Sequence, residues 1–127
     1  MTKILHGDNT VASRKQLGLV VEGARKRGVE ITRIDGSVDL GDLLLQIRSS
    51  GLFSQEKLVV VEDFFSYKGE VTDELKNTLD KARGEVVFWE GKEIGGKKLE
   101  SLKKIAKEAD GHLASARYQG KGKYELS

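Results

Sequence analysis

The stretch IRSSGLFSQEKLVVVED, residues 47–63, decides the fold because it joins the end of a helix to a buried strand. Upstream, apolar side chains at positions 40, 43, 44 and 47 share one face of a helix predicted over residues 39–48. Downstream, residues 58–61 are apolar without alternation, which is typical of a strand covered on both faces of a parallel sheet. The turn between them holds a bulky apolar pair, Leu52 and Phe53. This pair either packs on the core or binds a partner.

Strand and helix patterns alternate along the rest of the chain, which predicts an α/β fold. The expected architecture is a five-stranded, mainly parallel sheet with helices on both faces. Its first strand should lie centrally and its second near an edge, as in nucleotide-binding sheets. The predicted strands are residues 3–6, 30–34, 58–61, 85–89 and 111–118, and the predicted helices are residues 10–27, 39–48, 72–82 and 97–109.

The length of 127 residues predicts one domain, over residues 1–118, followed by a glycine- and lysine-rich linker over residues 119–127. The absence of cysteine excludes disulfides, a thiolate nucleophile and a cysteine-ligated zinc. No apolar run approaches the roughly 18 residues of a membrane span, and no signal-peptide pattern opens the chain. These features predict a cytoplasmic protein without a membrane partner.

The net charge of +2 is unevenly distributed. Residues 92–124 hold nine lysines and arginines against four acidic residues, as expected of a side that faces nucleic acid. The alternative is a solvated helix face, because the lysines at 97, 98, 103, 104 and 107 alternate with the apolar positions 99, 102 and 105. The alternative is favoured.

The first strand-to-helix junction is where a phosphate-binding loop would lie. A loop of the form G-x-x-x-x-G-K-[ST] starting at Gly7 would need glycine, lysine and a hydroxyl residue where this chain has Ala12, Ser13 and Arg14. Asp8 adds a carboxylate that would repel phosphate. The sequence therefore predicts no working P-loop and no bound nucleotide cofactor.

Other candidates for chemistry are weak. Glu62 and Asp63 end the apolar strand as the acids of a Walker B strand do, but without a phosphate loop we expect them to cap the strand and face solvent. His6 and His112 lie far apart without ligand spacing, so no metal site is expected. No Ser/His/Asp arrangement is present, and no catalytic residue is predicted.

Several aromatic residues follow the apolar strands. Phe64, Phe65 and Tyr67 could form a second exposed apolar patch, although packing against helices is the favoured interpretation. Phe88 and Trp89 end a core-like strand, so packing is also their expected role.

The order of segments, the stretch GLFSQEKLVVV at residues 51–61 and the later KKLESLKKIAKEADG at residues 97–111 resemble the delta subunit of the bacterial DNA polymerase III clamp loader. The resemblance runs from about residue 3 to residue 118. It implies an N-terminal AAA+ and RecA-like domain without a working P-loop, which leaves ATP hydrolysis to neighbouring subunits. In that family, this domain precedes a helical lid and a collar, so the chain resembles the isolated first domain of a longer protein.

The resemblance also implies a function in DNA replication. Leu52 and Phe53 would form a wedge that enters a hydrophobic pocket of the sliding clamp and helps to open the ring for loading onto primed DNA. The implied partners are the clamp, the other loader subunits and, indirectly, DNA. The family belongs to the polymerase holoenzyme, a nucleotidyltransferase complex, but no catalysis by this domain is expected. Two alternatives remain: a small nucleotide-dependent enzyme with an atypical phosphate loop, and a generic DNA-binding domain.

Three neighbours of the pair would belong to the same contact: Gly51, Arg48 and Gln46. Some delta subunits place a glutamine five residues before the phenylalanine, where this chain has Arg48. A wedge requires both Leu52 and Phe53 to be exposed in the free domain, so their joint replacement by alanine would leave thermal stability nearly unchanged. A core role predicts the reverse.

Overall fold

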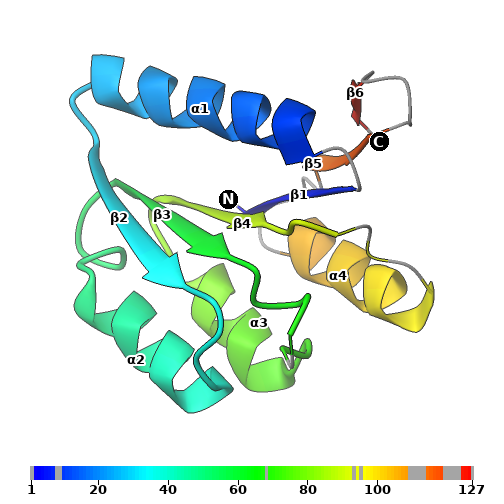
Figure 1. Cartoon of the computed structure of the whole chain (residues 1–127). Coiled ribbons are helices and arrows are strands. Elements are labelled where there is room, and N and C mark those ends of the chain that lie inside the picture. The colour runs from blue at the N-terminus through cyan, green and yellow to red at the C-terminus, as the bar shows by residue number, and fades with distance from the viewer. Residues whose placement is uncertain are drawn as a thin grey trace.

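Strands and helices alternate along the chain and build one sheet with helices on both of its faces (Figure 1). The computed structural model describes residues 2–7, 10–67, 69–92, 94, 96–108, 114–118 and 124–126. The elements are β1 (Thr2–Gly7), α1 (Thr10–Lys26), β2 (Glu30–Asp35), α2 (Leu40–Ser49), β3 (Lys57–Glu62), α3 (Asp73–Asp80), β4 (Glu85–Trp89), α4 (Gly96–Glu108), β5 (Ala114–Tyr118) and β6 (Tyr124–Leu126).

The sheet has the strand order β2-β3-β4-β1-β5-β6. Neighbours from β2 to β5 pair in parallel, and β6 pairs antiparallel with β5. The predicted α/β class, a parallel sheet flanked by helices, is confirmed. The predicted positions of β1 inside the sheet and β2 at its edge are confirmed as well.

The sixth strand differs from the sequence-based expectation. Residues 119–127 were expected to form a linker, but β6 lies within them and Tyr124 pairs with Tyr118 of β5. A strand of three residues is too short to show a period-2 pattern in the sequence, so periodicity could not reveal it.

Two apolar cores lie on opposite faces of the sheet. In Figure 1, α1 covers one face, while α2, α3 and α4 cover the other. Alternate residues of β3 point to the two sides: Leu58 and Val60 join the core under α1, and Val59 and Val61 join the core under α2, α3 and α4. All four are at most 2% exposed. Burial on both faces explains why this strand shows no alternation in the sequence.

Two of the helices that cover the second face, α2 and α3, begin at side-chain caps. Asp39 accepts a hydrogen bond from the backbone N–H of Asp42 at 2.9 Å and caps α2. Thr72 accepts one from the N–H of Leu75 at 3.1 Å and caps α3. These bonds satisfy backbone donors that have no partner within the helix. Because α2 follows β2 and α3 follows β3, both helices begin at the carboxyl edge of the parallel strands, where ligands of open α/β sheets bind.

Candidate functional site

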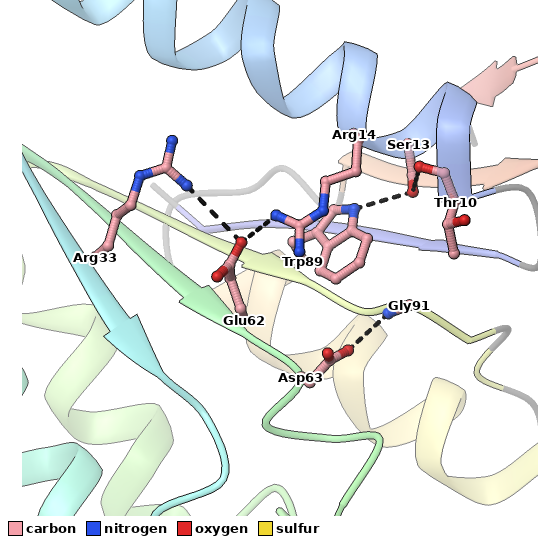
Figure 2. A network of polar contacts seen from close by, with 8 residues as sticks. All are labelled: Thr10, Ser13, Arg14, Arg33, Glu62, Asp63, Trp89 and Gly91. Carbon is pink, nitrogen blue, oxygen red and sulfur yellow. Dashed lines mark hydrogen bonds and ion pairs between the residues drawn. The ribbon is translucent and has the colours of Figure 1, made fainter.

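An ion pair spans the carboxyl edge of the sheet near the start of α1 (Figure 2). The guanidinium of Arg14, from α1, contacts Glu62 at the end of β3. Arg33, from β2, lies 3.8 Å from the same carboxylate oxygen. The prediction that Glu62 faces solvent is thus only partly right, because its half-buried side chain is paired on two sides. Ala12, Ser13 and Arg14 stand where a P-loop would hold phosphate, so an arginine bound to a carboxylate lies at this position.

Trp89 extends this network at the end of β4. Its indole ring lies under Arg14, with the guanidinium carbon 3.7 Å from the ring centroid. Its Nε1 donates a hydrogen bond to Ser13 Oγ at 2.9 Å, and Ser13 Oγ donates to the carbonyl of Thr10 at 3.3 Å. Figure 2 shows these side chains meeting between the helix and the strand ends. The expected packing role of Trp89 is confirmed, since its side chain is buried under α1.

Two further acids come directly after the same two strands, Asp63 after β3 and Glu90 after β4. Asp63 has a positive φ of 58° and accepts a hydrogen bond from the N–H of Gly91 at 2.8 Å. Glu90 is fully buried, and its Oε1 accepts hydrogen bonds from the N–H and Oγ of Ser66 at 2.7 and 2.9 Å. Burial raises the pKa of Glu90 to about 7, partly offset by the Ser66 hydrogen bonds. Glu90 therefore ties the segment after β3 to the end of β4.

The histidines and acids form no metal site within the described part of the chain. His6 is buried, and its Nδ1 accepts a hydrogen bond from the N–H of Ile94 at 3.0 Å. Among the described residues, no three His, Cys, Asp or Glu side chains group as metal ligands. His112 and Asp8 lie outside the described residues.

The turn between α2 and β3 is held by a set of hydrogen bonds. Gly51 adopts φ 87°, which favours glycine, and its carbonyl accepts from the N–H groups of residues 54 and 55 at 3.1 Å each. The buried ammonium of Lys57 binds the carbonyl of Ser50 and lies 3.4 Å from Glu30. Arg83 donates its N–H to the carbonyl of residue 52 at 3.0 Å and its guanidinium to that of residue 54 at 3.1 Å. Hydrogen bonds from within the turn, from Lys57 and from Arg83 therefore hold its backbone in place.

Leu52 is a core residue. It is 0% exposed and belongs to the same apolar cluster as Leu43 and Ile47 of α2. The expectation that it is exposed in the free domain is therefore wrong. An apolar residue directly after the glycine that ends a helix commonly packs back on the last helical turn, and Leu52 follows Gly51 in this way. This local pattern was the sequence signal that could have placed Leu52 in the core.

Phe53 behaves differently from its neighbour. Its side chain is partly buried and packs against the edge of the same cluster. It lines a hollow of about 490 Å³ between the end of α2, the turn and α3. Arg48 and Glu74 also line it and form an ion pair at 3.4 Å, and Gln46 is exposed on α2. The remaining residues of the lining are Asn77, Thr78 and Lys81.

The predicted aromatic patch and the predicted basic face are each described only in part by the packing of their residues. Phe64 and Phe65 are buried and stack with Phe88, which confirms their packing role, whereas Tyr67 is 65% exposed. On the predicted basic face, Lys98 donates a hydrogen bond to the carbonyl of Phe65 at 2.8 Å. The side chains at positions 103, 104 and 107 lie outside the described residues.

Comparison with family models, curated proteins and solved structures finds no match to this chain. Within the described residues, no helix is both long and apolar enough to cross a membrane.

Proposed function

We propose that this chain is a protein-binding domain of the clamp-loader delta kind, which contacts a sliding clamp through the α2–β3 turn without using ATP. The observation that carries the proposal is the place of the Leu52–Phe53 pair. The pair lies in the turn that joins α2 to β3. In the sheet, β1 lies between β4 and β5, and β2 lies at the edge. This strand order also supports assignment to the AAA+ and RecA-like class.

The nucleotide position supports a domain that does not hydrolyse ATP. A phosphate at the start of α1 would have to separate Arg14 from Glu62 and from the ring of Trp89. It would also meet no P-loop lysine, because Ser13 stands at that position and its hydroxyl accepts the indole N–H of Trp89. A nucleotide-dependent enzyme would have to rearrange this network before binding its substrate, so it is the weaker alternative.

Within the pair, the proposed contact falls to Phe53. Leu52 is fully buried, so it anchors the turn rather than reaching a partner. Phe53 sits at the border of the core and the hollow, with Arg48 beside it, and its exposed part is available to a partner. Completing the burial of an aromatic ring contributes on the order of 1–3 kcal/mol, which suits an anchor residue in a small interface. The hydrogen bonds of Lys57 and Arg83 hold the turn in place before binding, which lowers the entropic cost of association.

The test is direct binding of the whole chain to an immobilised bacterial sliding clamp, measured by biolayer interferometry without nucleotide. Saturable binding that is unchanged by ATP and magnesium supports the proposal. The absence of binding up to about 100 µM, a concentration well above that of a functional weak complex, overturns it.

A further inference from the structure

The two carbonyl groups on either side of Phe53 are held by a single residue from another part of the chain. Arg83, in the loop between α3 and β4, donates its backbone N–H to the carbonyl of Leu52 at 3.0 Å. Its guanidinium donates to the carbonyl of Ser54 at 3.1 Å. Arg83 follows Ser54 by 29 residues, so these bonds tie the turn to a segment that is remote in the sequence.

The guanidinium constrains the turn in a way that the turn's own hydrogen bonds do not. The carbonyl of Gly51 accepts from the N–H groups of Ser54 and Gln55 at 3.1 Å each, and these bonds close the turn on itself. A closed turn has a fixed shape, but its direction relative to the sheet depends on contacts with other elements. Leu52 supplies such a contact before Phe53, by its burial in the core, and Arg83 supplies one after it.

The loop that carries Arg83 is itself firmly placed. The backbone N–H of Ala82 donates to the carbonyl of Leu79 at 3.2 Å, at the end of α3. On the other side, Gly84 is buried, and a Cβ at this position would collide with the backbone of Lys57. The guanidinium therefore reaches the turn from a stretch of main chain that is fixed both before and after Arg83.

The side chain of Arg83 governs only the exposed half of the turn. The carbonyl of Leu52 is held by the main chain of Arg83, so a change of the side chain leaves this bond in place. Phe53 is only partly buried, and the three residues that follow it are exposed. Removal of the guanidinium would therefore free the segment after the pair, while the buried anchor remains.

We propose that Arg83 is the positioning residue of the α2–β3 turn and fixes the direction in which Phe53 faces a partner. This inference rests on the proposed clamp contact. Arginine suits the role better than lysine, because its planar guanidinium loses less side-chain entropy for each hydrogen bond that it forms. A turn that is already held in its binding conformation avoids an ordering cost on association.

The first experiment uses the free chain. Amide exchange with water is measured by NMR on the whole ¹⁵N-labelled chain, for the wild type, Arg83→Ala and Arg83→Lys. Exchange of Ser54 and Gln55 should be at least about threefold faster in Arg83→Ala, which is the effect of losing one hydrogen bond, and intermediate in Arg83→Lys. The melting temperature should fall by less than about 3 °C, because the buried anchor is kept. Unchanged exchange of both amides in Arg83→Ala overturns the inference.

The second experiment measures binding kinetics on an immobilised sliding clamp, at about 0.1 M and about 0.5 M salt. Arg83→Ala should slow association at least about threefold at both salt concentrations and change dissociation less than about twofold, because a smaller fraction of the molecules is ready to bind. Lys81→Ala is the matched control, since Lys81 is an exposed cation of the same loop and lines the hollow beside Phe53. Any effect of this control on association should disappear at the higher salt concentration, as for a screened surface charge.

The two experiments separate this inference from the clamp contact on which it rests. If the effect of Arg83→Ala on association disappears at high salt as that of Lys81→Ala does, Arg83 acts as a surface charge, and the inference is overturned. If the wild-type chain does not bind the clamp, the clamp contact is wrong. Amide exchange in the free chain still decides in that case whether Arg83 fixes the turn.

Discussion

Replacing Leu52 by alanine should lower the free energy of unfolding by about 3 kcal/mol, within the range for Leu→Ala at a buried site. Leu52 is 0% exposed, and the truncation leaves a cavity among the residues of α2 and the adjoining strands. The turn cannot easily collapse into this cavity because Arg83 holds the carbonyl of residue 52 and Lys57 holds the carbonyl of Ser50. For a domain of this length, the loss corresponds to a fall in melting temperature of roughly 10 °C.

Circular dichroism during urea and thermal unfolding measures this loss, with Leu45→Ala as the matched control. Leu45 belongs to the same helix as the residues that Leu52 contacts, but it is 63% exposed, so its truncation should change stability by less than about 0.5 kcal/mol. Phe53→Ala should fall between the two, because its ring is only partly buried. If Leu52→Ala proved as harmless as Leu45→Ala, Leu52 would not be a core residue, and both members of the pair would again be candidates for the partner contact.

Three further predictions concern the buried acid, the glycines and the nucleotide position. The pKa of Glu90 is raised from 4.5 to about 7 in the folded chain, so its protonated form stabilises the fold fully below about pH 4.5. This stabilisation, on the order of 3 kcal/mol, is lost as the pH rises to about 7. In Glu90→Gln the pH dependence should flatten, which urea unfolding at several pH values can measure. Gly36→Ala should be strongly destabilising, because its new Cβ would meet the backbone of Glu62 and Phe64, whereas Gly18→Ala in α1 meets nothing and should stabilise by up to about 1 kcal/mol; equal melting temperatures for the two variants would contradict this packing. Calorimetric titration with ATP and magnesium should give no binding, and a micromolar dissociation constant would show that the Arg14–Glu62 pair does not close the site.

Much of the fold was predictable from the sequence because its signals are local and periodic. The four consecutive apolar residues of β3 predicted a buried strand, and the 3.6-residue spacing of α2 predicted a helix. The alternation of strands and helices along the chain then predicted a parallel sheet. β6 was missed because three residues carry no usable period.

The functional surfaces were less predictable because they depend on contacts between distant segments. Two strands and two helices lie between α1, which carries Arg14, and β4, which ends at Trp89, and no local pattern indicates that the guanidinium lies on the indole ring. The same holds for Glu90, which meets Ser66 from the end of another strand. The sequence did indicate that Leu52 and Phe53 are unusual for a turn, but only the packing shows that one is buried and the other stands at the border.

We propose that Phe53 presents the α2–β3 turn to a sliding clamp, and one comparison of dissociation constants tests this contact. Phe53→Ala should weaken clamp binding at least about tenfold, equivalent to about 1.4 kcal/mol. Val11→Ala, which truncates an 81% exposed apolar side chain on α1, should leave the dissociation constant within about twofold. Equal affinities for the wild-type chain and folded Phe53→Ala would show that Phe53 does not contact the clamp.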